Sequence, residues 1–275
     1  MKGEKMKDFV LYLNGINGLA LGGAAILASL EKRELRPSKM YVCGVGALFA
    51  NDFAALDGNF EERITYRFSH LSKSFRLYIE TGDSLFSKFT SIYKLASSVA
   101  SKKLKGFVKE KTMLTRLENT SKPKMDLVYS AVNILTASET LITPREWKVG
   151  LRAAMSVLPI FVPCDYRGQK LVSTTSVTGV PGFSKLDEEE KFKVFVNTMP
   201  LVGKKKPTRT WEIMMRADYL RTVELTKRFS DKFDIILDFS KAAPELSDFS
   251  LSTWKRLKEI SNGMVNNILE PALKA

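Results

Sequence analysis

Short apolar runs that end at glycine or asparagine turns recur along the chain. Residues 9–13 read Phe-Val-Leu-Tyr-Leu and are followed by Asn14 and Gly15, and residues 39–43 are followed by the turn Gly44-Val45-Gly46. Residues 19–35 and 47–56, rich in small and apolar side chains, lie after these turns. A continuous apolar run of this length is typical of a buried parallel strand. The pattern predicts strand, turn, helix, strand, turn and helix, an open α/β sheet whose ligands bind at the carboxyl ends of the strands.

The same pattern returns in the second half of the chain. Further strands are predicted at residues 126–133, 192–195 and 234–238, and helices at 151–157, 211–229 and 254–269. The middle of the chain, residues 57–124, is rich in Ser, Lys and Phe at helical spacing. We predict one domain over residues 1–275, with 57–124 as a helical cap or a membrane-facing insertion.

Charge is the strongest signal in the composition. The 43 Lys and Arg residues exceed the 30 Asp and Glu residues and give a net charge of +13. Such an excess favours an acidic membrane surface or nucleic acid as a partner, or serves solubility alone. No nucleic-acid-binding motif accompanies it, so a nucleic-acid role is the least favoured of the three.

Two basic runs are candidates for a surface that meets a membrane or another anion. The first interleaves lysines with Leu104, Phe107 and Val108, as an amphipathic segment would, and the second is a surface loop. A solvated helix covering the sheet explains the first run equally well. The candidate lysines are Lys102, Lys103, Lys105, Lys109, Lys204, Lys205 and Lys206.

Other compositional features narrow the class of protein. Cys43 and Cys164 form no CxxC pair and no metal-ligand spacing, which indicates reduced thiols and no metal or other cofactor. No apolar run reaches the length of a transmembrane helix. Asparagine-glycine pairs interrupt the apolar N-terminus, which argues against a signal peptide. We therefore expect a cytoplasmic protein, peripheral to the membrane if it binds one; the oligomeric state stays open.

The order of motifs resembles the patatin-like lipid acyl hydrolases over most of the chain. In that family a first strand enters a glycine-rich oxyanion loop, which matches Gly15, Ile16, Asn17 and Gly18 here. The next strand ends in Gly-x-Ser-x-Gly, the nucleophile elbow, at the position of Val42-Cys43-Gly44-Val45-Gly46. A Pro-rich segment (residues 159–163) and an Asp-Gly-Gly turn, at residues 173–175 here, follow in the family's order. The resemblance implies a three-layer α/β/α fold with a mainly parallel central sheet.

The reactive groups of that family are replaced in this chain. Gly44 stands where the nucleophilic serine would be, and Ser173 stands where the aspartate would activate it. A glycine has no nucleophile, and a serine hydroxyl is no useful base near neutral pH. Leu19 takes the place of the loop arginine, and Val42 replaces the first glycine of the elbow. From Val42 we expect an elbow under less steric demand than usual.

Three functions follow from this interpretation. We predict a protein that has lost acyl hydrolysis and binds a lipid, an acyl chain, a membrane surface or a protein partner. The alternatives are a lipid acyl ester hydrolase with a relocated nucleophile and a basic nucleic-acid-binding protein. Cys43 is the candidate for a relocated nucleophile, although a buried structural thiol is the ordinary outcome beside a strand end. The single histidine, His70, leaves little scope for a Ser-His-Asp triad.

Overall fold

The computed structural model describes residues 6–15, 19–56, 58–65, 120–157, 161–199, 210–240 and 250–275. Its centre is one sheet in the order β5-β6-β3-β2-β1-β7-β8, with β4 paired to β3 outside this path. Five neighbouring strands, from β3 to β8 in that order, are parallel. The strands are β1 (Phe9–Leu13), β2 (Lys39–Val42), β3 (Leu127–Asn133), β4 (Glu139–Ile142), β5 (Cys164–Tyr166), β6 (Gln169–Ser173), β7 (Phe192–Asn197) and β8 (Ile235–Asp238).

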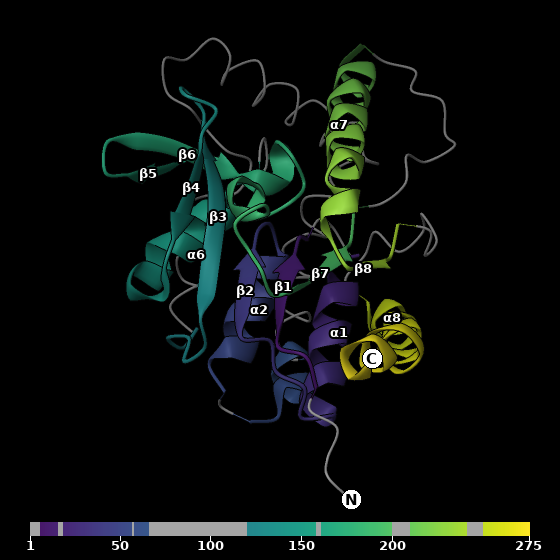
Figure 1. The fold of residues 1–275 in the computed structure, drawn as a ribbon. Helices are drawn as coiled ribbons and strands as arrows, with labels where there is room; N and C mark the ends of the chain where they lie inside the picture. The colour runs from purple at the N-terminus through teal and green to yellow at the C-terminus, as the bar shows by residue number, and fades with distance from the viewer. Residues whose placement is uncertain are drawn as a thin grey trace, which may run out of the picture.

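Helices cover the sheet in layers, so the chain has the predicted three-layer α/β/α fold with a mainly parallel sheet (Figure 1). Helix α7 stands over the end of the sheet to which β1 and β2 point (Figure 1). The helices are α1 (Ala20–Lys32), α2 (Gly46–Ala54), α6 (Trp147–Met155), α7 (Thr210–Arg228), α8 (Leu251–Met264) and α9 (Glu270–Lys274), with a π-turn at Val265–Leu269. Short 3-10 turns occupy Pro144–Glu146, Thr174–Ser176, Phe183–Lys185 and Ser230–Lys232.

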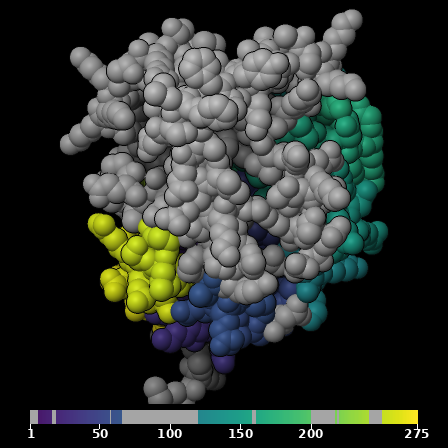
Figure 2. Space-filling view, turned by 180° about the vertical axis from the view of Figure 1, so that it is seen from behind, coloured from purple at the N-terminus to yellow at the C-terminus, as the bar shows by residue number. Residues whose placement is uncertain are grey.

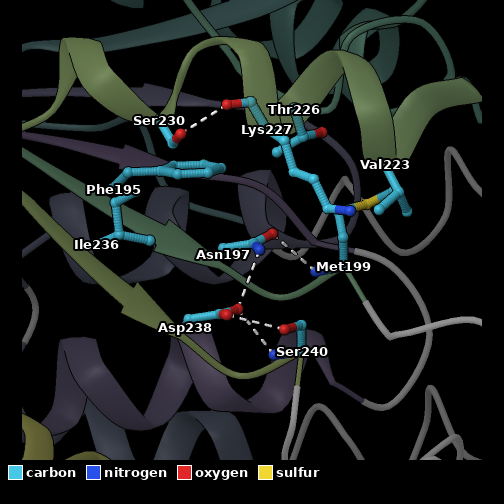
Figure 3. A pocket seen from close by; sticks show the side chains of 10 residues that line it. All are labelled: Phe195, Asn197, Met199, Val223, Thr226, Lys227, Ser230, Ile236, Asp238 and Ser240. Carbon is cyan, nitrogen blue, oxygen red and sulfur yellow. Dashed lines mark hydrogen bonds between the residues drawn. The ribbon is translucent and has the colours of Figure 1, made fainter.

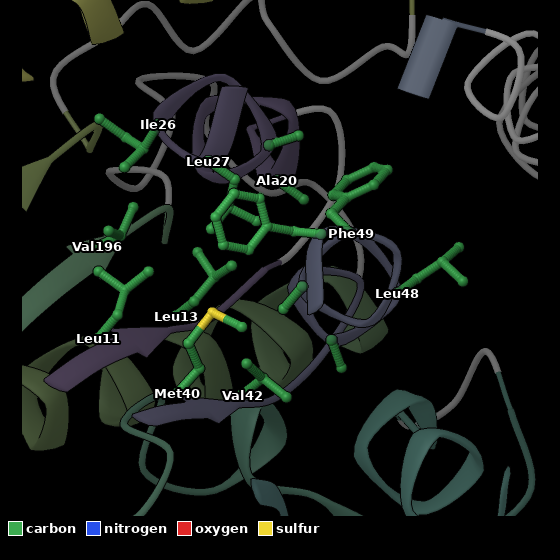
Figure 4. Close-up of a cluster of buried hydrophobic side chains, with 14 of the residues drawn as sticks. Leu11, Leu13, Ala20, Ile26, Leu27, Met40, Val42, Leu48, Phe49 and Val196 are labelled. Atoms are coloured by element: carbon green, nitrogen blue, oxygen red, sulfur yellow. The ribbon is translucent and has the colours of Figure 1, made fainter. Parts of the chain in front are cut away.

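The alternation of side chains along each strand divides the core into two layers. On β1, Leu11 and Leu13 join the larger cluster under α1 and α2, whereas Val10 and Tyr12 join a smaller cluster on the opposite face. The larger cluster places leucines of β1 against Ile26 and Leu27 of α1 and Phe49 of α2 (Figure 4). Because both faces are covered, β1 is buried along its whole length, as its unbroken apolar sequence predicts.

The C-terminal helices close the side of the sheet covered by α1. Ser29 of α1 donates a hydrogen bond to Asn262 of α8 at 2.9 Å, and Trp254 and Leu257 of α8 belong to the larger cluster. Ser250 begins α8 by accepting a hydrogen bond from the backbone N–H of Thr253. On the surface seen from behind, the yellow C-terminal residues lie beside the purple and blue residues of the N-terminal third (Figure 2). Among the described helices, none is both long and apolar enough to cross a bilayer.

Two antiparallel hairpins were not predicted. Strand β4 pairs with β3, and β5 pairs with β6, which itself lies antiparallel to β3. Strand β6, Gln169–Ser173, is therefore one of the strands that the sequence pattern did not predict. Helix α6 also begins earlier than predicted, at Trp147. The hairpins matter for function because β6 delivers Ser173 to the end of β2.

Candidate functional site

The elbow, Val42–Gly46, joins the end of β2 to the start of α2. Gly44 has φ +63°, the left-handed region that glycine adopts most readily. Its N–H donates to the carbonyl of Ala154 at 2.8 Å and to the hydroxyl of Ser173 at 3.1 Å. The N–H of Val45 donates to the carbonyl of Gly15 at 3.0 Å. The elbow is therefore tied to the β1–α1 loop, to α6 and to the end of β6.

The glycines of the elbow and of the β1–α1 loop pack backbone to backbone. A Cβ on Gly44 would lie 2.0 Å from the carbonyl oxygen of Gly15 and 2.7 Å from the hydroxyl oxygen of Thr175. A Cβ on Gly15 would lie 2.2 Å from the nitrogen of Gly46. The expectation that the elbow is under little steric demand was therefore wrong. Val42 is accommodated in the core, but the turn beyond it has no room for side chains at these glycines.

Ser173 lies at the end of β6, fully buried and directly beside the elbow. Its N–H donates to the carbonyl of Ser156 at 2.9 Å, and its hydroxyl oxygen accepts from the N–H groups of Gly44 and Thr175, at 3.1 and 3.3 Å. The fold thus brings Gly44 and Ser173, 129 residues apart in sequence, into hydrogen-bond contact. The Ser173 hydroxyl caps the 3-10 turn Thr174–Ser176 and holds the elbow.

Cys43 is fully buried, and its sulfur accepts a hydrogen bond from the hydroxyl of Thr175 at 3.0 Å. Burial raises the pKa of the Cys43 thiol to about 12, and the hydrogen bond from Thr175 offsets only part of that effect. The thiolate is the nucleophilic form of cysteine. At neutral pH this side chain is a protonated, enclosed thiol.

Asn14 is the main residue at this edge whose role the sequence did not indicate. The asparagine was interpreted only as a turn former, yet it is fully buried. Its amide nitrogen donates to the carbonyl of Gly179 at 2.8 Å, and its amide oxygen accepts from the backbone N–H of Thr198 at 2.8 Å. It therefore joins the end of β1 to the end of β7 and to the loop after Ser173. Its position at the end of a buried strand was the only available signal.

Glu139 fixes the opposite side of that loop. Its carboxylate accepts a hydrogen bond from the hydroxyl of Ser130 and from the N–H groups of Gly182 and Ser184, the latter two at 2.7 and 2.8 Å. The hydroxyl of Ser130 also contacts that of Thr174. Because β4 was not predicted, Glu139 could not be singled out from the sequence.

A cavity of about 140 Å³ lies at the carboxyl ends of β7 and β8, under α7 (Figure 3). Neither Gly44 nor Ser173 lines it. Its lining residues are Phe195, Asn197, Met199, Val223, Thr226, Lys227, Ser230, Ile236, Asp238 and Ser240. Within the described ranges, no group of three or more His, Cys, Asp or Glu side chains is placed to hold a metal ion.

Several predicted site residues lie outside the described residues. These are Ile16, Asn17 and Gly18 of the predicted oxyanion loop, His70, and the candidate lysines Lys102, Lys103, Lys105, Lys109, Lys204, Lys205 and Lys206. Most of the predicted cap, residues 57–124, is also outside them. Their proposed roles stay predictions.

Comparisons with known proteins add little to this geometry. No protein-family model matches the chain, and no curated protein matches it. Among solved structures, the chain is similar to VipD from Legionella pneumophila, with 11% sequence identity and a TM-score of 0.37. That similarity covers 97% of this chain and 77% of VipD.

Proposed function

We propose that this chain is a patatin-like protein that has lost acyl hydrolysis and acts by binding a lipid, an acyl chain, a membrane surface or a protein partner. One observation carries the proposal. The carbonyl oxygen of Gly15 fills the space in which a side chain on Gly44 would begin. A hydrolase of this type needs a hydroxyl there, exposed to the substrate.

The surroundings of Gly44 support the same conclusion. The N–H of Val45, which follows the nucleophile position, donates to Gly15 and is therefore not free for an oxyanion. The Ser173 hydroxyl is buried and accepts two backbone hydrogen bonds. A relocated nucleophile at Cys43 would need a thiolate, which burial disfavours at neutral pH.

Ester hydrolysis by the purified full-length chain tests the loss of activity. With p-nitrophenyl butyrate and with phospholipid vesicles, we expect turnover no higher than that of buffer. Labelling by a fluorophosphonate probe, read by intact mass, should also be absent. Turnover that disappears in Cys43→Ala but persists in Cys164→Ala, which also removes a buried thiol, would establish a relocated nucleophile instead. Turnover that disappears in Ser173→Ala would identify Ser173 as the relocated nucleophile.

The net charge of +13 supports an acidic membrane surface as the first partner to test. We expect the chain to sediment with vesicles containing phosphatidylserine, not with pure phosphatidylcholine vesicles, and to be released by salt. Replacing Lys204, Lys205 and Lys206 together by Glu should weaken this binding. Equal weak binding to both vesicles, insensitive to salt, would remove the role of an acidic membrane surface. Salt-dependent binding of an oligonucleotide without vesicle binding would favour the nucleic-acid alternative instead.

A further inference from the structure

The cavity at the ends of β7 and β8 is separate from the elbow and has a distinct chemistry. The last residues of the two strands, Asn197 and Asp238, form its polar floor, and α7 forms one wall (Figure 3). Carboxyl ends of parallel strands are where α/β sheets bind ligands. Its apolar lining comes from Phe195, Met199, Val223 and Ile236.

The carboxylate of Asp238 is held in place by three hydrogen bonds. The amide nitrogen of Asn197 donates to it at 3.0 Å, and Ser240 donates through its N–H at 2.9 Å and through its hydroxyl at 2.8 Å. In the part of the chain that the structure describes, no lysine or arginine forms an ion pair with Asp238. A carboxylate offers about four acceptor positions, and the described residues occupy three of those on Asp238.

The two hydroxyl groups whose hydrogen bonds are seen at the cavity beyond Ser240 already donate within the protein. The hydroxyl of Thr226 donates to the carbonyls of Thr178 and Thr222, and that of Ser230 donates to the carbonyl of Lys227. Lys227 also lines the cavity, and its ammonium is paired with Glu224 at 2.7 Å. What the cavity offers a ligand is therefore the fixed carboxylate of Asp238 and hydroxyl oxygens that can accept, with the Lys227–Glu224 ion pair beside them and apolar side chains around them.

We propose that this cavity binds a small organic cation, an alkylammonium whose charged nitrogen contacts Asp238 and whose hydrocarbon part lies between Phe195, Val223 and Ile236. The volume of the cavity limits the size of the ligand, because a protein cavity of about 150 Å³ holds a ligand as large as benzene. A chain of about four carbons fits this limit. The ammonium would come from a free amine or from an aminated lipid headgroup, which present the same chemistry.

Binding of n-butylammonium to the full chain, followed by isothermal titration calorimetry, tests the proposal. n-Butanol and butyrate have the same carbon chain without the positive charge. We expect n-butylammonium to bind at least tenfold more tightly than either. Asp238→Asn keeps the shape and removes the charge, and should weaken n-butylammonium at least tenfold. Asp187→Asn is the control, since it removes an exposed carboxylate that pairs with Lys232 elsewhere; its binding should equal that of the wild type.

Val223→Phe provides a second variant that leaves the polar floor intact. It should fill the cavity and abolish binding even if Asp238→Asn proves too unstable to measure.

Dihexanoyl phosphatidylethanolamine, kept below its micelle concentration, distinguishes the two sources of the ammonium group. Binding of this lipid and not of dihexanoyl phosphatidylglycerol identifies a lipid headgroup. Binding of n-butylammonium alone identifies a free amine. Absence of n-butylammonium binding, or binding unchanged by Asp238→Asn and Val223→Phe, overturns the proposal. Neither result bears on the loss of hydrolysis, which the ester assays test separately.

Discussion

The carbonyl oxygen of Gly15 lies 2.0 Å from the point that a Cβ on Gly44 would occupy. The two glycines come from successive strand-to-helix turns, after β1 and after β2, and their contact is backbone against backbone. In addition, the N–H of Val45 donates to the same Gly15 carbonyl at 3.0 Å. A side chain at Gly44 would have to displace a carbonyl that is already used as an acceptor. The packing of the two turns thus leaves no room for a side chain at Gly44.

Gly44→Ala is expected to destabilise the protein far more than its backbone angle alone requires. Gly168 is the matched control, because it has φ +77° and nothing lies within 4 Å of its added Cβ. The left-handed conformation alone costs about 1–2 kcal/mol for a non-glycine residue. We expect about that loss for Gly168→Ala and at least about 3 kcal/mol for Gly44→Ala, since overpacking adds to it. Urea unfolding of both variants measures the difference; equal losses would show that the contact with Gly15 is not restrictive.

The same contact predicts that introducing the serine and aspartate of the patatin-like pattern at positions 44 and 173 does not produce hydrolytic activity. Gly44→Ser combined with Ser173→Asp returns the two side chains of the family pattern. The serine has no space in which to stand, so p-nitrophenyl butyrate hydrolysis should stay at background in the folded fraction of this double variant. Circular dichroism identifies that fraction. Hydrolysis that appears in the double variant and not in either single variant would mean that the loop at Gly15 shifts and makes room for the serine side chain.

Asn14→Ala should be among the most destabilising polar substitutions at this edge of the sheet. It leaves the carbonyl of Gly179 and the N–H of Thr198 buried without their partner. An unsatisfied buried group costs about 1–3 kcal/mol, so we expect a loss of about 2–4 kcal/mol. Asn266→Ala, an exposed amide that bonds to Arg33, should cost less than about 1 kcal/mol. Comparable losses in the two variants, by urea unfolding, would contradict the structural role of Asn14.

Much of this edge could be predicted because it follows from local pattern. The buried run at Phe9–Leu13 and the glycine turn at Gly44 identify the parallel strands and the elbow, since full burial demands a continuous apolar sequence. The hairpins could not be predicted in the same way. Strand β4 is only four residues long and mostly half-buried, and it is specified by pairing with β3 rather than by its own periodicity. The steric closure at Gly44 depends on the approach of Gly15, which no local pattern encodes.

The Cys43 thiol should make stability fall at alkaline pH. Its ordinary pKa is 9.0, and burial raises it to about 12 in the folded protein. Between these values the unfolded chain loses the proton and the folded chain keeps it, so the free energy of unfolding decreases as pH rises, by up to about 1.4 kcal/mol per pH unit. Well below pH 9 both states keep the proton, and the thiol contributes almost no pH dependence. Urea unfolding at pH 8 and pH 10 should show a smaller decrease in Cys43→Ala than in the wild type; parallel decreases would mean that the thiol ionises in the folded state.

Two buried tyrosines should respond in opposite directions to loss of the hydroxyl. Tyr12 of β1 and Tyr129 of β3 are both fully buried. Within the described residues the Tyr12 hydroxyl has no hydrogen-bond partner, and its ring stacks on Tyr41 with centroids 5.0 Å apart. The Tyr129 hydroxyl donates to the side-chain oxygen of Asn51. A buried hydroxyl without a partner opposes folding, whereas a buried hydrogen bond supports it.

Tyr12→Phe is therefore expected to stabilise the protein by about 1 kcal/mol, because the ring packing is kept and the unpaired hydroxyl is removed. Tyr129→Phe should destabilise it by about 1–3 kcal/mol, because the oxygen of Asn51 loses its donor. For a chain of this size the two changes correspond to melting temperatures that move apart by about 4–12 °C. Differential scanning fluorimetry measures both variants side by side. A loss of stability in Tyr12→Phe equal to that in Tyr129→Phe would show that the Tyr12 hydroxyl is satisfied in solution.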